Sequence, residues 1–188
     1  MKKVFCTVMA VIMAISSAGL VFAWEGATPV KAQTPILITS AGQGPGGEIV
    51  NALVTRNRIS PSRLAARAGV EFLQNTNTLI IVLSSSLKGL GAAGISINQE
   101  LARLDSLIVE ARNRGMLIVG AHLEGEDRRG GYDEDIINRV AHRVDYLIVR
   151  RDGNADGIFT RIARQHNIPL TYIDRGIQLG PVLVAMFN

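Results

Sequence analysis

Five short, unbroken runs of mainly apolar residues constrain the fold of this chain more than any other feature. They are residues 36–38, 79–83, 117–119, 146–149 and 170–173. None of them alternates regularly between apolar and polar residues, as a strand with one face in solvent would. Continuous runs of this length are typical of parallel strands that helices cover on both faces. The runs therefore predict a buried parallel sheet of about five strands.

Amphipathic helical patterns lie between these runs. In the clearest pattern Ile97, Leu101, Leu104 and Ile108 share one helical face. Alternating strands and helices with right-handed crossovers define the α/β class, so we predict a Rossmann-like three-layer fold. Residues 59–76 are ambiguous between strand and helix and leave the second strand open. Further helices are expected near residues 49–54, 133–143, 154–166 and 181–187.

The first 23 residues have the pattern of a secretory signal peptide. Lys2 and Lys3 precede an apolar stretch from Val4 to Leu20, and small or branched residues then end at Ala23. A second cleavage position follows Ala32. An uncleaved membrane anchor is the alternative, although the stretch is near the lower length limit for a span. We therefore expect a periplasmic or secreted protein with no membrane segment after cleavage.

The sequence after residue 23 indicates how the rest of the chain is organised, and its charge balance argues against a nucleic acid partner. Residues 24–34 have no periodicity and are predicted to be a flexible leader, and residues 35–188 form a single α/β domain. Without residues 1–23, 18 basic and 16 acidic residues remain, which is too little charge for a general polyanion surface. We therefore expect no nucleic acid partner. The only cysteine is Cys6, so the mature chain forms no disulfide.

Four separated motifs resemble an uncharacterised family of exported bacterial proteins, a domain of unknown function. They are residues 86–94, 127–130, 145–149 and 153–157, in this order. The resemblance covers residues 35 to about 180. It implies a Rossmann-like fold and brings no known activity.

A glycine-rich loop follows the first predicted strand. Gly42, Gly44 and Gly47 have the G-x-G-x-x-G spacing of dinucleotide-binding turns, in which the backbone approaches a phosphate at a helix N-terminus. Pro45 removes one N–H donor, however, and no acidic residue clearly ends the second strand to bind a ribose. A tight turn without a dinucleotide is the alternative.

The loop after the run at 79–83 contains three serines, followed by Lys88 and Gly89. Because Lys88 precedes the glycines, the segment is not a Walker A loop. Hydroxyl groups, an ammonium group and exposed backbone N–H groups together suit a carboxylate or a phosphate. The alternative is a loop in which the serines bond only to the local backbone.

The third loop follows the run at 117–119 and is rich in charged residues. His122 is a candidate general base with Glu124 beside it, and Arg128 and Arg129 are candidates to bind an anion. His122 with Glu124 also resembles the start of a metal site, but no convincing further histidine completes it. The alternative is a solvated loop in which the arginines pair with its own acids.

The fourth loop, residues 152–157, reads Asp-Gly-Asn-Ala-Asp-Gly and matches the opening of an EF-hand calcium loop. The closing acidic ligand is missing, because Ala163 occupies its position. Asn154 as a helix cap and Asp156 in the first turn explain the same residues without a metal.

Ligands of open parallel sheets bind beyond the carboxyl ends of the strands, where all four loops lie. We predict an exported domain that binds a small polar or anionic molecule there. The alternatives are a hydrolase that uses His122 or a nearby carboxylate as base, and an interaction module or homo-oligomer that pairs through the apolar tail at 182–187. No catalytic residue, metal ligand or cofactor is assigned. The residues predicted to contact the ligand are Ser40, Gly42, Gln43, Ser84, Ser85, Ser86, Lys88, Gly89, His122, Glu124, Arg128, Arg129, Asn154 and Asp156.

Overall fold

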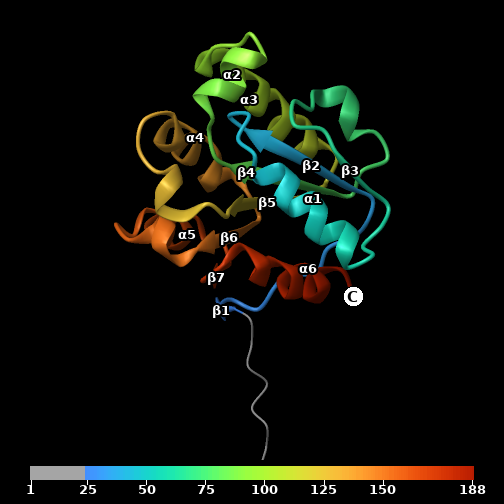
Figure 1. The fold of residues 1–188 in the computed structure, drawn as a ribbon. Coiled ribbons are helices and arrows are strands. Elements are labelled where there is room, and N and C mark those ends of the chain that lie inside the picture. Colours follow the sequence, from blue (N-terminus) through green and yellow to red (C-terminus); the bar gives the residue numbers. More distant parts are fainter. Residues whose placement is uncertain (1–23) are drawn as a thin grey trace, which may run out of the picture.

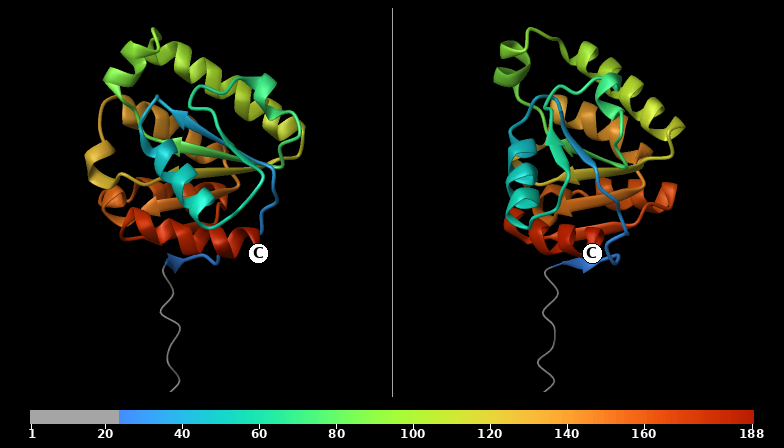
Figure 2. Two further views of the ribbon diagram at one scale, coloured as in Figure 1. Left: turned by 45° about the vertical axis from the view of Figure 1, so that its right-hand side comes forward. Right: turned by 90° about the vertical axis from the view of Figure 1, so that its right-hand side faces the viewer.

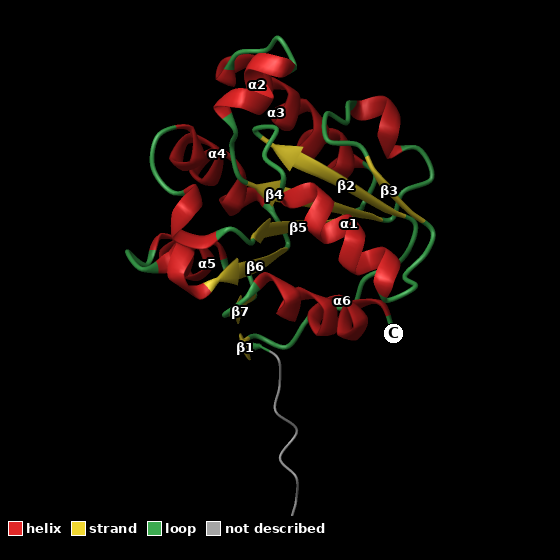
Figure 3. Ribbon diagram, in the orientation of Figure 1, coloured by secondary structure: helices red, strands yellow, loops and turns green. Residues whose placement is uncertain are grey.

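A computed structural model describes residues 24–188 as three layers, with one sheet between two layers of helices (Figures 1 and 3). The expected signal peptide at residues 1–23 lies outside the described residues. The α/β class predicted from the apolar runs is confirmed. The helices are α1 (Gly46–Arg56), α2 (Leu87–Ala92), α3 (Ile97–Asn113), α4 (Tyr132–Val140), α5 (Ile158–His166) and α6 (Leu179–Phe187).

The sheet of the described chain has seven strands, in the order β1-β7-β6-β5-β4-β2-β3. Each of the five apolar runs lies in a strand, and all neighbouring strands are parallel except β1 and β7. The prediction of about five strands misses the two short strands at the sheet edges, β1 and β3. The strands are β1 (Glu25–Gly26), β2 (Ile36–Ala41), β3 (Ser62–Leu64), β4 (Thr78–Leu83), β5 (Leu117–His122), β6 (Tyr146–Arg150) and β7 (Leu170–Ile173).

The central strands are buried on both faces, which explains their unbroken apolar sequences. In β4, Leu79, Ile81 and Leu83 pack into the cluster beneath α3, α4 and α5. Ile80 and Val82 point to the opposite cluster, beneath α1 and α6. Figure 2 shows these two sets of helices on opposite sides of the sheet. Both pleat faces of β4 therefore need apolar side chains.

The ambiguous stretch at residues 59–76 forms a short strand and a turn of 3-10 helix. β3 pairs in parallel with the amino-terminal half of β2 and lies at the edge of the sheet. The 3-10 helix spans Val70–Leu73 and buries Leu73. A strand of three residues is too short to show a periodic pattern, so the sequence left it open.

The prediction of a flexible leader over residues 24–34 is wrong. Glu25–Gly26 forms β1 against β7, and the amide of Ala32 donates to the carbonyl oxygen of Met186. The ammonium of Lys31 donates to carbonyl oxygens at the carboxyl end of α6, including that of Ala185 at 3.1 Å. This segment covers the edge of β7, which would otherwise expose unpaired backbone groups.

The apolar tail completes the core of the domain. Val182, Leu183 and Met186 of α6 are fully buried in the cluster beneath α1 and α6. These side chains are therefore not free to bind a second subunit. Among residues 24–188, no helix has both the length and the apolar character needed to cross a membrane.

Candidate functional site

The strand order places a reversal of direction between β2 and β4. Counting only the parallel strands in chain order, the sheet runs 2-1-3-4-5-6, so the connections after β2 and after β4 leave in opposite directions. In such doubly wound sheets the crevice at the reversal is the usual ligand site. Residues 42–45 follow β2, and residues 84–86 follow β4, so both loops meet at this point.

These two loops close the crevice by packing directly on each other. Gln43 and Ser85 form an antiparallel β-bridge, and the amide of Ser86 donates to the carbonyl oxygen of Gly42 at 2.8 Å. The space that holds the ligand in an open crevice is therefore occupied by backbone of the protein itself.

The glycines permit this close approach. A Cβ on Gly42 would lie 2.8 Å from Cα of Ser85, and one on Gly89 would lie 2.3 Å from the carbonyl oxygen of Gln43. Gly42 also has a φ of +103°, which other residues rarely adopt. Gly44 packs on the same neighbouring loop, because its added Cβ would lie 2.7 Å from the carbonyl oxygen of Ser84. Loop packing thus explains two of the three glycines in the G-x-G-x-x-G spacing and gives no support to a dinucleotide site.

A buried carboxylate holds the first loop in place. Glu100 of α3 is fully buried, and its Oε1 accepts hydrogen bonds from the amide of Gly42 at 2.8 Å and from Nε2 of Gln43 at 3.0 Å. Burial alone raises the pKa of Glu100, but the hydrogen bonds and charge of Arg103, together with the two loop donors, lower it below its ordinary value of 4.5.

Arg103 extends this network to the neighbouring segments. Its Nη2 donates to the carbonyl oxygen of Ser40 at 2.6 Å, and its Nη1 donates to that of Ala68 at 2.7 Å. The pair therefore joins α3 to the end of β2 and to the segment after β3. Sequence analysis missed Glu100, although it lies on the predicted apolar face of the helix between Ile97 and Leu104, where an acid is unusual.

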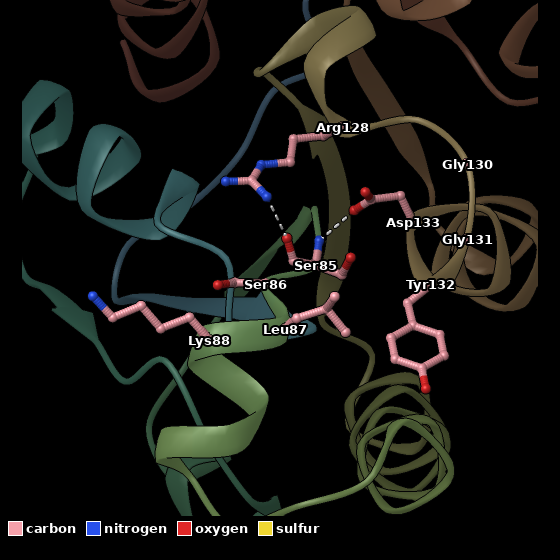
Figure 4. Close-up of a pocket in the computed structure, with 9 residues that line it drawn as sticks. All are labelled: Ser85, Ser86, Leu87, Lys88, Arg128, Gly130, Gly131, Tyr132 and Asp133. Carbon is pink, nitrogen blue, oxygen red and sulfur yellow. Dashed lines mark hydrogen bonds between the residues drawn. The ribbon is translucent and has the colours of Figure 1, made fainter.

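With the crevice closed, the main pocket lies one step along the sheet edge, between the loop after β4 and the start of α4 (Figure 4). Its volume is about 630 Å³, within the range of small-molecule sites. The lining residues are Ser85, Ser86, Leu87, Lys88, Arg128, Gly130, Gly131, Tyr132 and Asp133.

The pocket has a cationic and an apolar side. In Figure 4 the charged ends of Arg128 and Lys88 lie toward one side, and the side chains of Leu87 and Tyr132 lie toward the other. Leu87 is 74% exposed and Tyr132 39% exposed, so both offer apolar surface to the pocket that they line.

The two cations differ in how they are held. Nη1 of Arg128 donates to the carbonyl oxygen of Ser85 at 2.9 Å, and its Nε lies 3.3 Å from Oε1 of Glu124. Lys88 makes no hydrogen bond or ion pair with any part of the chain that the structure describes. Arg128 is therefore a positioned, partly neutralised cation, and Lys88 is an unpaired one.

The structure brings together some of the predicted ligand contacts and separates others. Four line the pocket, six lie in the adjoining closed loops or beside them, and four lie elsewhere. The first group is Ser85, Ser86, Lys88 and Arg128; the second is Ser40, Gly42, Gln43, Ser84, Gly89 and Glu124; the third is His122, Arg129, Asn154 and Asp156. Sequence analysis missed Leu87, Gly130, Gly131, Tyr132 and Asp133.

His122 has no access to the pocket, which removes the reason to regard it as a general base. It is fully buried, with Nδ1 2.8 Å from the carbonyl oxygen of Leu83 and Nε2 3.0 Å from that of Gly125. Its ring packs against Phe159, with 5.1 Å between ring centroids. Both ring nitrogens are thus engaged with the backbone, and the residue joins β4 to the loop after β5.

The segment that resembles a calcium loop uses its oxygen atoms internally. Arg129 pairs with Asp156 at 2.8 Å and with Glu134 at 2.7 Å, and Oδ1 of Asn154 accepts from the amide of Phe159 near the start of α5. The Arg129 guanidinium lowers the pKa of Asp156 to about 2. Within residues 24–188, no three histidine, cysteine or acidic side chains are grouped so as to hold a metal ion.

Fold and site together define an α/β domain with a loop-lined pocket at the carboxyl edge of its sheet. Residues 33–187 match the family described as "Domain of unknown function (DUF6305)", and the chain belongs to this family. The chain matches no curated protein sequence.

Three solved structures show a distant likeness. TesA is 13% identical over 72% of this chain and 77% of its own, with a TM-score of 0.34. The psychrotrophic esterase EstA from Pseudoalteromonas sp. is 12% identical over 74% and 78%, also with a TM-score of 0.34. A truncated 3-deoxy-D-arabino-heptulosonate 7-phosphate synthase from Thermotoga maritima is 12% identical over 84% of this chain and 50% of its own, with a TM-score of 0.33. A likeness this low indicates no function for this chain.

Replacing Gly89 with Ala tests the packing of the two loops. The added Cβ would meet the carbonyl oxygen of Gln43, so we expect a loss of about 1–3 kcal/mol in the free energy of unfolding. Gly91→Ala is the matched control in the same helix, because no atom lies within 4 Å of its added Cβ. Since alanine favours helix, that variant should gain up to about 1 kcal/mol. Equal effects in urea denaturation would contradict the loop contact.

Replacing Glu100 with Gln tests the buried pair. Because the variant leaves Arg103 without its counter-charge, we expect a loss of about 3–5 kcal/mol in the free energy of unfolding at pH 7. The folded pKa of Glu100 lies below 4.5, so the stabilisation is complete above pH 4.5 and declines as the pH falls through the folded value. The difference between wild type and variant should therefore shrink in acid. Glu110→Gln, which removes a partner from an exposed pair with Arg114, should cost less than about 1 kcal/mol at either pH. A pH-independent difference for Glu100→Gln would contradict the assignment.

Proposed function

We propose that this protein is a binding domain for a small organic anion that carries an apolar group. The observation that supports this most strongly is the division of the pocket. Lys88 and Arg128 are on one side, and Leu87 and Tyr132 on the other, within about 630 Å³. A carboxylate or phosphate group would lie against the two cations, and an apolar group would cover the exposed leucine and tyrosine.

The contacts of Arg128 leave it able to bind an anion. Its Nη2 donates to no acceptor in the described chain, while Nη1 and Nε are engaged with Ser85 and Glu124. A guanidinium held in this way loses little side-chain freedom when it binds a ligand, and its N–H groups match the geometry of an oxyanion. Lys88 supplies a second, adjustable charge from the first turn of α2.

The proposal predicts a specific loss of affinity in Lys88→Met. The probes are 3-phenylpropionate and hexanoate, compared with the uncharged 3-phenylpropanol and hexanol in thermal shift and calorimetric titrations of the purified protein. The two carboxylates should raise the melting temperature, because they bind the folded state, and the alcohols should not. Removal of one partly screened charge should weaken carboxylate binding by about fivefold, which corresponds to roughly 1 kcal/mol.

Lys31→Met is the matched control, because it removes the other lysine of residues 24–188. The ammonium of Lys31 bonds to the carboxyl end of α6, and Lys31 does not line the pocket. It should leave carboxylate affinity unchanged. If the alcohols bind as tightly as the carboxylates, or if both lysine variants lose the same affinity, the pocket is not an anion site.

Export to the periplasm or the medium is a second part of the proposal, and the charge and apolar pattern of residues 1–23 supports it. Cleavage after Ala23 would keep β1 and the Lys31 contacts, whereas cleavage after Ala32 would remove both. We therefore expect the exported protein to begin at Trp24, as measured by mass spectrometry of cell fractions. Recovery of the chain only in the cytoplasm, with Met1 retained, would contradict export.

A further inference from the structure

Asp133 is an acidic side chain inside a pocket whose other charges are positive. It occupies the first turn of α4 and is only 8% exposed. One carboxylate oxygen, Oδ1, accepts a hydrogen bond from the amide of Ser85 at 2.5 Å, as Figure 4 shows. The second oxygen, Oδ2, accepts no hydrogen bond from residues 24–188, yet it is not enclosed by protein. Because Asp133 lines the pocket, this oxygen is open to a ligand.

The structural role of Asp133 uses only one of its two carboxylate oxygens. An acid in the first turn of a helix is favourable, and its bond to Ser85 positions the loop after β4. Neither role uses the second oxygen. A carboxylate that is nine-tenths buried is stabilised most by a charged donor, because a neutral partner leaves its charge uncompensated. No arginine or lysine of the described chain forms an ion pair with it.

We propose that the ligand of this pocket is a zwitterion, an α-amino acid or a close analogue with an apolar side chain. Its carboxylate binds Arg128 and Lys88, its ammonium group donates to Oδ2 of Asp133, and its side chain lies against Leu87 and Tyr132. This inference rests on the proposed function, because it keeps the anion site and adds a second recognition point of opposite charge.

The charge pattern of the pocket favours a zwitterion over a simple anion. A plain carboxylate would bring a negative group into a pocket that already contains the nearly buried Asp133 carboxylate, and the two would repel each other. An ammonium group on the same ligand removes this repulsion and supplies the missing donor. Discrimination between ligands with and without such a group is large when a buried polar group would otherwise remain unpaired.

The test compares amino acids with the same molecules lacking one charged group. The probes are L-phenylalanine, 3-phenylpropionate and 2-phenylethylamine, and the parallel set L-leucine, 4-methylpentanoate and 3-methylbutylamine, titrated calorimetrically into the purified protein. At least one amino acid should bind about tenfold or more tightly than both of its one-charge analogues.

Asp133→Asn identifies the group responsible. The asparagine keeps an oxygen that can accept from the Ser85 amide, but it lacks the negative charge. It should weaken amino acid binding about tenfold and leave 3-phenylpropionate binding unchanged or tighter. Asp135→Asn is the matched control, because it removes the same charge from the same turn of α4 at an exposed position outside the pocket lining. It should leave both affinities unchanged.

The outcomes separate this inference from the proposed function. If 3-phenylpropionate binds as tightly as phenylalanine and Lys88→Met weakens both, the zwitterion proposal is overturned and the anion site stands. If the amines bind as tightly as the amino acids, or if none of the six probes and no other organic anion binds, both proposals are overturned. If Asp133→Asn does not fold, the wild-type comparison and Asp133→Glu, which shifts the carboxylate and should weaken only the amino acid, decide the question.

Discussion

The ion pair of Glu100 and Arg103 is the interaction on which the arrangement of the carboxyl edge depends. A lone carboxylate at this depth would be too costly to keep charged, but Glu100 receives donors from Arg103, Gly42 and Gln43 together. The pair thereby fixes the loop after β2 relative to α3, and through Ser40 it also fixes the end of the strand. Because the donors come from separate segments, the network specifies one loop conformation instead of merely adding stability.

The position of that loop determines where a ligand has room. In a doubly wound sheet the gap between β2 and β4 is the expected site, but here backbone bonds between Gly42 and Ser86 close it. The next gap, above β4 and β5, remains open, and Gly130 and Gly131, both with positive φ, line it just before α4 begins. The same glycine spacing thus suits two structures, a turn around a phosphate and a turn packed against a neighbouring loop, and only the neighbouring loop distinguishes them.

Much of the fold could be predicted because a strand that is buried on both faces, such as β4, has an unbroken apolar sequence. The short edge strands have no such pattern: β3 has three residues, and β1 is held by pairing with β7 far along the chain.

The pocket was predictable only in part. Ser85, Ser86, Lys88 and Arg128 were found because they follow strands, whereas Tyr132 and Asp133 look like an ordinary helix start. His122 was assigned a chemical role because nothing in a single sequence shows that the last residue of β5 points into the core.

The distribution of ion pairs explains why the charges of the pocket are available. Several acidic side chains outside the pocket are paired with arginines from other elements, as Asp105 is with Arg143 and Asp156 is with Arg129. Such exposed pairs contribute little stability individually, but they neutralise some of the charge that would compete for a ligand. Asp133 differs because its partner is a backbone amide, which positions the carboxylate without cancelling its charge. Lys88 differs because no acid of the described chain reaches it. The pocket therefore keeps charges of both signs that no other side chain of the described residues fully cancels, and this is the arrangement that a ligand of matching charges would recognise.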